Sequence, residues 1–73
     1  MNRDNSCVAD TIELLLLNQE ALRAGLEEVS LWIKQRGATV VHENVLGALT
    51  TLDLNAKGIA DGIELLRSQA AGD

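Results

Sequence analysis

Apolar residues recur over residues 8–33 at intervals that alternate between four and three positions. On an α-helix this spacing places them in one row that can face a partner helix along its whole length. The row consists of Val8, Ile12, Leu15, Gln19, Leu22, Leu26, Val29 and Ile33. Gln19 is its single polar member. The pattern predicts one long helix over about residues 6–36, with Ser6 as its N-cap.

A second row on the same predicted helix lies well around the helix axis from the first. Its members also alternate by threes and fours: Leu14, Leu17, Ala21, Ala24, Glu28 and Leu31. A helix that is apolar on two sides needs two neighbours, and the chain offers one other segment of similar length. We therefore expect the second neighbour to be another copy of the chain or a different protein.

A break in the pattern at Gly37 predicts a turn over residues 37–39. Gly37 suits the left-handed position that closes many helices, and Thr39 can cap the next one. The second helix is predicted over about residues 40–69. Its apolar row keeps the same alternation throughout: Val45, Leu49, Leu52, Ala56, Ile59, Ile63, Leu66 and Ala70. The alternative is an interruption near residues 55–58, because residues of low helix propensity, including Gly58, lie there.

The two apolar rows can be docked in an antiparallel register. Ile33 against Val45 forms the layer beside the turn, and Val8 against Ala70 forms the last layer. This register is centred on Thr39, and it places Leu22 and Leu26 in the central layers. The sequence therefore predicts an all-α fold, an antiparallel helical hairpin of two long helices that forms a single domain over residues 1–73.

Composition favours association of this hairpin with a second copy. A chain of 73 residues encloses only a small core, and one cysteine and one histidine cannot build a disulfide framework or a zinc site to support it. A lone hairpin would leave Leu14, Leu17 and Leu31 exposed, a larger apolar patch than a monomer usually shows. We therefore expect a homodimer that forms a four-helix bundle.

Hydropathy and charge limit the compartment and the partners. The longest apolar run, residues 14–17, is too short to span a membrane, and acidic residues precede it where a secretory signal would be basic. We expect a cytoplasmic protein. The formal net charge of −5 disfavours nucleic acid and anionic membrane surfaces as partners.

The sequence offers little support for catalysis. Cys7 is expected in the first turn, where the helix dipole favours a thiolate, but no base or second cysteine accompanies it. His42 and Glu43 are neighbours on a helix and do not face each other, so His42 is interpreted as a polar residue of the second helix near Arg36. We predict no catalytic residue, no metal site, no cofactor and no enzyme activity.

The candidate interface residues are Leu14, Leu17, Gln19, Ala21, Ala24, Leu31 and Trp32. Gln19 falls near the middle of its helix, where a two-fold axis could pass, and its expected partner is Gln19 of the other chain. Trp32, the sole aromatic residue, either caps the end of the core or serves as a binding hot spot. Gly58 and Gly62 indicate a surface that tolerates close packing in the assembly.

These features favour a small non-enzymatic interaction protein, acting as an adaptor, regulator or chaperone-like partner. We expect it to work as a homodimer through helix–helix packing, and to bind itself or another protein. A homodimeric antiparallel hairpin of this size resembles in architecture the plasmid-encoded Rop-type regulators. That resemblance implies paired RNA loops as an alternative partner, against which the low number of basic residues counts. A helix that binds membrane surfaces is disfavoured because its polar side would be rich in Lys and Arg.

Overall fold

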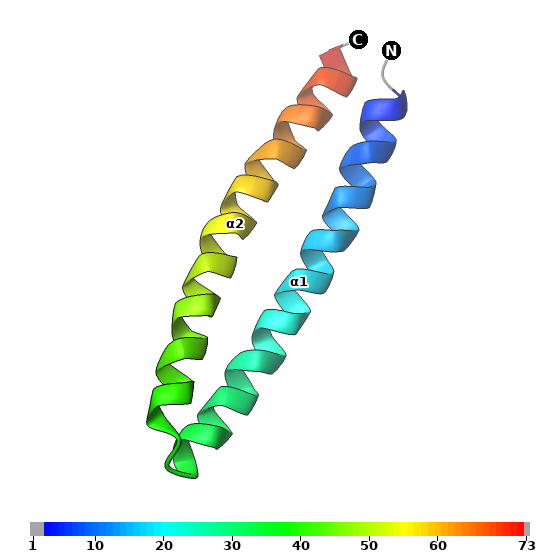
Figure 1. Cartoon of the computed structure of the whole chain (residues 1–73). Coiled ribbons are helices and arrows are strands. Elements are labelled where there is room, and N and C mark those ends of the chain that lie inside the picture. Colours follow the sequence, from blue (N-terminus) through cyan, green and yellow to red (C-terminus); the bar gives the residue numbers. More distant parts are fainter. Residues whose placement is uncertain (1–2, 73) are drawn as a thin grey trace.

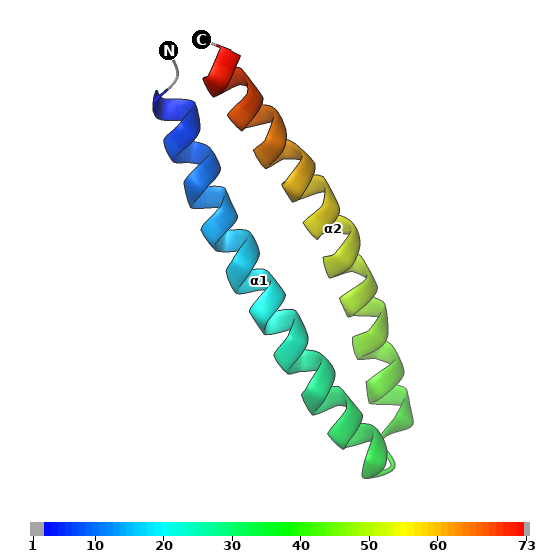
Figure 2. The ribbon, with the colours of Figure 1, turned by 180° about the vertical axis from the view of Figure 1, so that it is seen from behind.

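The protein is a hairpin of two long helices, as a computed structural model of residues 3–72 shows (Figure 1). Helix α1 spans Arg3–Gln35 and helix α2 spans Thr39–Gly72. The helices lie side by side in opposite directions, and both ends of the chain lie at the same end of the molecule (Figures 1 and 2). The Cα atoms extend over 55 × 15 × 10 Å. The prediction of an all-α helical hairpin is confirmed.

Helix α1 begins three residues before the predicted start. Asp4, Asn5 and Ser6 all lie within the helix, so the prediction that Ser6 is the N-cap is wrong. Asp4 instead places a carboxylate in the first turn, where it complements the positive end of the helix dipole. Cys7 consequently lies beyond the first turn. Met1, Asn2 and Asp73, which the predicted domain includes, lie outside the described residues.

The turn is built on Gly37, which has a positive φ of 96°. The Gly37 N–H donates to the Lys34 carbonyl over 2.9 Å, and the Ala38 N–H donates to the Ile33 carbonyl over 3.2 Å. These two bonds form a Schellman motif, which closes α1 as Gly37 predicted. The Ala38 carbonyl then accepts the His42 N–H over 3.1 Å. Ala38, rather than Thr39, therefore holds the N-cap position of α2.

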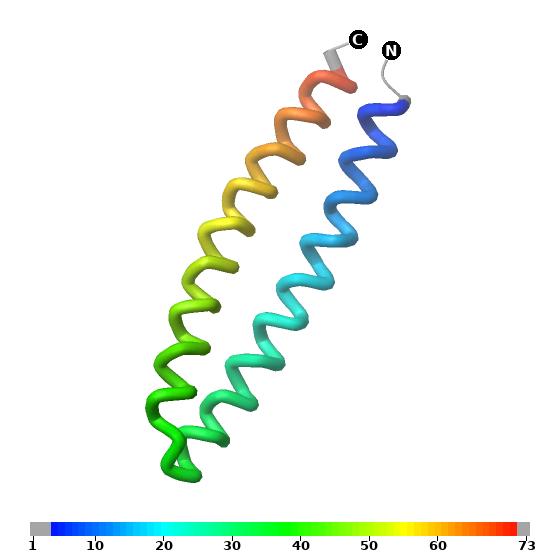
Figure 3. Tube along the Cα trace, in the orientation of Figure 1, coloured from blue at the N-terminus to red at the C-terminus, as the bar shows by residue number. Residues whose placement is uncertain are grey.

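Helix α2 is continuous through residues 55–58, so the alternative of an interruption there is wrong (Figure 3). Its predicted apolar row faces α1 along the whole length: every member is buried or half-buried, with Leu49 and Ile63 the most enclosed. Burial of this row outweighs the low intrinsic helix propensity of Gly47, Gly58 and Gly62, which costs about 1 kcal/mol each relative to alanine.

The row of α1 that faces α2 differs from the predicted one. Val8, Leu15, Leu22 and Val29 are exposed, and Leu26 is half-exposed. The residues that contact α2 follow each of those first four positions by one. The contact row consists of Asn5, Ala9, Ile12, Leu16, Gln19, Arg23, Ser30 and Ile33. Helix α1 is thus turned about its axis by roughly 50° from the prediction, half of the 100° that separates consecutive helical residues.

Polar partners on α2 explain this rotation. Arg23 reaches Asp53, with Nε 2.6 Å from Oδ1, and Ser30 reaches His42. The predicted row would have turned Val29 toward the His42 ring and left that buried polar group without this partner. Small side chains at Ala9 and Ser30 also let the helices approach closely, and both are buried.

The register differs slightly from the predicted one. Side chains meet across the helices in the pairs Asn5–Gln69, Asp10–Arg67 and Arg23–Asp53. The midpoints of these pairs lie at Gly37, between Ala38 and Thr39, and at Ala38, so the hairpin is centred before Thr39. The predicted layers that contain Val8, Leu15, Leu22 and Val29 are wrong, because those residues do not face α2.

Candidate functional site

Helix α1 carries a broad uncharged surface beside its contact with α2. Val8, Leu15, Leu22 and Val29 each precede a contact residue and therefore form a row directly beside it. A further row lies outside them. The two rows together comprise Val8, Thr11, Leu15, Asn18, Leu22, Gly25, Val29 and Trp32, all of them exposed. Large aliphatic side chains dominate this part of the surface.

Helix α2 continues the surface on the same side of the hairpin. Val41, Ala48, Asn55 and Gly62 precede contact residues of α2, just as the aliphatic row does in α1. In an antiparallel pair such positions of the two helices lie on one side. The rows of α2 comprise Val41, Asn44, Ala48, Thr51, Asn55, Gly58, Gly62, Leu65 and Gln69, again all exposed. We call the rows of both helices together the uncharged face.

The ion pairs between the helices lie along the opposite edge of the hairpin. Arg67 donates to Asp10 over 2.8 Å and also pairs with Glu13, and Arg23 binds both Asp53 and Glu27. Hydrogen bonds with Asp53 and then Glu27 raise the pKa of Arg23, and those with Asp10 and then Glu13 raise the pKa of Arg67. Exposed pairs of this kind add little stability. They do fix which edge of the hairpin is charged.

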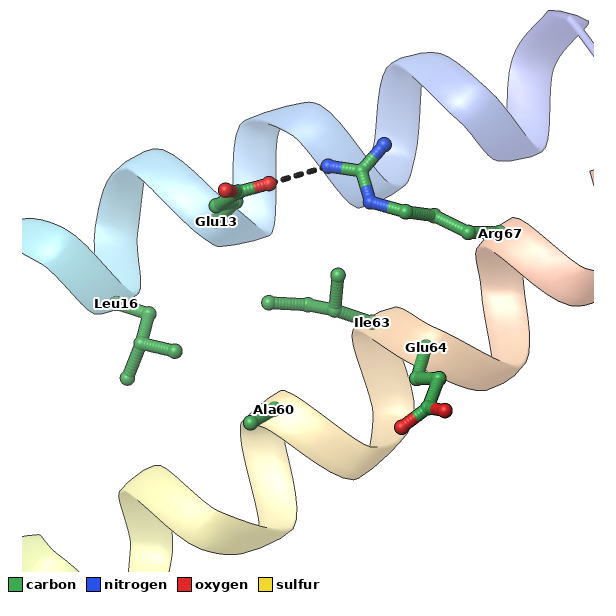
Figure 4. A pocket seen from close by; sticks show the side chains of 6 residues that line it. All are labelled: Glu13, Leu16, Ala60, Ile63, Glu64 and Arg67. Carbon is green, nitrogen blue, oxygen red and sulfur yellow. Dashed lines mark hydrogen bonds and ion pairs between the residues drawn. The ribbon is translucent and has the colours of Figure 1, made fainter.

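A shallow depression of about 330 Å³ lies at this charged edge. Figure 4 shows Leu16, Ala60 and Ile63 beneath the ion pair between Glu13 and Arg67. Its floor is apolar, and the guanidinium of Arg67 is already engaged by two carboxylates of α1. Glu64 also lines the depression.

Most of the predicted interface residues lie on the outer side of α1. Leu14, Leu17, Ala21, Ala24 and Leu31 are all exposed. They form a surface separate from the uncharged face, because the helix presents them on its far side from the contact with α2. We call these five residues the outer row. Their place in an interface stays a prediction.

Gln19 occupies the contact row of α1, as predicted, and is half-buried. Its Nε2 donates to the backbone carbonyl of Leu52 over 3.3 Å. The amide therefore has a partner within the same chain. Its pairing with Gln19 of a second chain stays a prediction.

Trp32 does not cap the core. The side chain is 54% exposed and lies on the uncharged face near the turn. The guanidinium carbon of Arg36 stands 4.6 Å from the centroid of the indole ring. This distance is typical of a cation–π contact, which holds the ring while leaving much of it accessible.

A buried polar pair was missed from the sequence. Ser30 and His42 are both buried, and the Ser30 hydroxyl lies 2.8 Å from Nδ1 of His42. His42 lies near the start of α2, as interpreted from the sequence, but its burial between the helices was not predicted. An apolar pattern does not include polar residues, so it could not predict this pair. The one signal in the sequence is position: Ser30 lies one helical turn before Ile33, and His42 lies one helical turn before Val45. Cys7 is an exposed free thiol.

Within residues 3–72, no cluster of histidine, cysteine, aspartate and glutamate side chains could hold a metal ion. Neither α1 nor α2 has an apolar stretch long enough to cross a bilayer. The fold and the exposed surfaces place the chain in the class of all-α helical hairpins. No protein-family model matches the chain, and no curated protein or solved structure does either.

Proposed function

We propose that this chain is a small non-enzymatic interaction protein that works as a homodimer through helix–helix packing. The observation that carries the proposal is the uncharged face, which extends from Val8 to Trp32 on α1 and from Val41 to Gln69 on α2 and exposes Leu15 and Leu22. Apolar surface of this extent on a small protein is typical of a site that another protein covers.

The small core supports the same proposal. Among the described residues, the buried apolar side chains are Ala9, Leu16, Leu49 and Ile63. A core this small is hard to balance against the conformational entropy of some seventy residues. Docking two hairpins would produce a four-helix bundle, which encloses far more apolar area per chain.

The outer row suits a role as an adaptor, regulator or chaperone-like partner. Leu14, Leu17 and Leu31 remain accessible on α1 when the uncharged face is covered, and Ala21 and Ala24 leave room for a helix to approach. An amphipathic helix of another protein would bury its apolar side here. The dimer would then present two identical binding surfaces.

The charge distribution favours protein partners over the Rop-type alternative of RNA. Arg23 and Arg67 are bound by carboxylates of the same chain, Lys57 pairs with Asp61, and Arg36 contacts Trp32. Four of the six basic residues therefore already have intramolecular partners. Phosphate contacts would need several free cations gathered on one side.

The position of the histidine supports the non-enzymatic part of the proposal. His42 is buried between the helices and hydrogen-bonded to Ser30, so its ring is not presented to a substrate. A general base must reach the proton that it removes.

Sedimentation across a dilution series tests the homodimer directly. We expect a dimer at micromolar concentration that dissociates on dilution, whereas a monomer at every concentration would contradict the proposal. Capture from a cell extract then tests the outer row. Wild-type protein should retain a protein partner that Leu17→Glu loses, with the exposed substitution Leu54→Glu on α2 as the control.

A further inference from the structure

We propose that a second copy of the chain docks on the uncharged face, with α1 of each copy lying antiparallel to α2 of the other. The inference rests on the proposed homodimer. It adds the surface through which the copies meet and the pairing of their helices, so that the two can fail separately.

The charge pattern identifies a second copy as the occupant. Each chain carries a formal charge of −5, so most surfaces of two copies repel each other. The rows of the uncharged face hold no charged residue over Val8–Trp32 and Val41–Gln69, and Asp4 and Arg36 border them at the two ends of α1. The acidic residues Glu13, Glu20 and Glu27 instead lie on the opposite edge, where Arg23 and Arg67 are. Two copies can therefore meet on this face without placing the acidic side chains of that edge opposite each other.

The sizes of the side chains determine which helices pair. On α1 the row directly beside the contact carries Leu15, Leu22 and Val29, whereas the central part of α2 carries only small side chains on the same face. These are Ala48, Thr51, Asn55, Gly58 and Gly62. A Cβ atom added at Gly58 or Gly62 would meet no atom within 4 Å. The side chains of α2 thus project little here, and the larger side chains of α1 can pack against them.

The large side chains of α1 and the small ones of α2 also lie at corresponding levels along the hairpin. Leu16 packs in one cluster with Ile63, and Figure 4 shows Leu16, Ala60 and Ile63 around one depression, so Leu15 stands at the level of the segment that contains Gly62. A two-fold axis parallel to the helices brings α2 of the partner to the same level. Leu15 of one copy would then enter the space above Gly58 and Gly62 of the other.

The next layer agrees with this arrangement. Arg23 contacts Asp53, which places the neighbouring Leu22 at the level of Thr51 and Asn55. Leu22 of one copy would thus meet small side chains of the partner. The alternative, with α1 against α1, would oppose leucines to leucines and small residues to small residues. Helix spacing depends on side-chain size, so the two α1 helices would lie farther apart than the two α2 helices.

The area available is sufficient for a stable dimer. The molecule extends over 55 Å along its length and 15 Å across the two helices. The outline of the hairpin in projection is thus about 800 Å², similar in size to the surface that each partner buries in a standard stable interface. Leu15 and Leu22 lie near the middle of this face, and hot-spot residues usually lie near the centre of an interface.

Two matched substitutions test the surface. Leu22 lies on the uncharged face and is 68% exposed, whereas Leu14 lies on the outer row of the same helix and is 64% exposed. We expect Leu22→Glu to weaken dimerisation by about 100-fold or more, because a charge is placed in the centre of the interface. Leu14→Glu should leave the dissociation constant within about 3-fold of the wild type, as for a site outside an interface. Circular dichroism at high protein concentration checks that both variants remain helical.

The outcomes separate this inference from the homodimer itself. The proposed surface is wrong if the wild type dimerises and Leu14→Glu disrupts the dimer, with or without disruption by Leu22→Glu. It is also wrong if neither variant disrupts the dimer. In each case the homodimer itself still stands. A wild-type monomer at all concentrations removes both.

Cross-linking tests the pairing of helices in protein that is close to the wild type. In a Cys7→Ser background, a mixture of Leu15→Cys and Gly62→Cys chains should form a disulfide-linked heterodimer on mild oxidation. A mixture of Leu15→Cys and Leu22→Cys chains is the control and should give little heterodimer. Efficient cross-linking of the control mixture instead would show that α1 pairs with α1 and would overturn the proposed arrangement.

Discussion

The Ser30 hydroxyl lies 2.8 Å from Nδ1 of His42, and both side chains are buried between the helices near the turn. Replacement of Ser30 by alanine leaves the ring nitrogen buried without this partner. We expect Ser30→Ala to lower the free energy of unfolding by about 1–3 kcal/mol. Urea unfolding at a fixed protein concentration measures this, with exposed Ser68→Ala as the control. Equal losses in the two variants would mean that the pair adds no stability.

Leu49 is the most enclosed large side chain of α2, with 2% of its surface exposed. Leu49→Ala should lower the free energy of unfolding by about 2–5 kcal/mol through lost burial and a residual cavity. Leu54 on the same helix is 69% exposed, and Leu54→Ala should change stability by about 0.5 kcal/mol or less. Chemical denaturation of both variants at one concentration checks this difference. A comparable loss in both would contradict the assignment of the contact row.

Gly37 has a φ of 96°, a backbone conformation that a side chain disfavours. Gly37→Ala should destabilise the hairpin by about 1–2 kcal/mol, the cost of a left-handed conformation for an L-residue. Gly47 lies inside α2, where an added Cβ meets nothing within 4 Å. Gly47→Ala should therefore stabilise the protein by about 0.5–1 kcal/mol. Thermal unfolding of the two variants should show shifts of opposite sign, and shifts of the same sign would refute the argument.

Gln19 is the polar member of the α1 contact row, and it donates to the carbonyl of Leu52. That carbonyl keeps its place in the hydrogen-bond ladder of α2 when the amide is removed. We expect Gln19→Leu to raise the midpoint of unfolding, because an apolar side chain gains burial at little polar cost. If Gln19 also contacts its counterpart in a dimer, sedimentation of the variant should show a mixture of assemblies. A lower midpoint with one well-defined assembly would point to a water-exposed role.

The residues that face the other helix could be predicted from the sequence for α2 but only in part for α1. In α2 a single apolar row alternates without competition, and residues such as Leu49 and Ile63 face α1 as predicted. In α1 two rows satisfy the same alternation. They share Ile12, Gln19 and Ile33, and at the positions between these they differ by one residue. Hydrophobicity favours the row with Leu15, whereas the structure uses the row with Leu16.

The choice between those rows depends on contacts that periodicity does not represent. Arg23 and Ser30 look unsuitable for a helix contact when hydrophobicity alone is considered. Their partners, Asp53 and His42, lie on the other helix and become apparent only once the register is known. The candidate site depends on the same choice, because the uncharged face includes Val8, Leu15, Leu22 and Val29, the aliphatic residues that hydrophobicity assigns to the core.

The turn also determines the order in which the hairpin can close. The Ser30–His42 contact joins residues 12 positions apart, whereas Asn5 and Gln69 are 64 positions apart. Loop closure by the second pair alone would cost about 1.5 kcal/mol more in chain entropy, since the cost rises with the logarithm of loop length. Folding should therefore start at Gly37, and contacts between the helices should form in order from the turn toward the termini. Amide hydrogens near the chain ends should exchange with solvent first. Domain swapping, in which two copies exchange a helix, would therefore begin at that end of the hairpin.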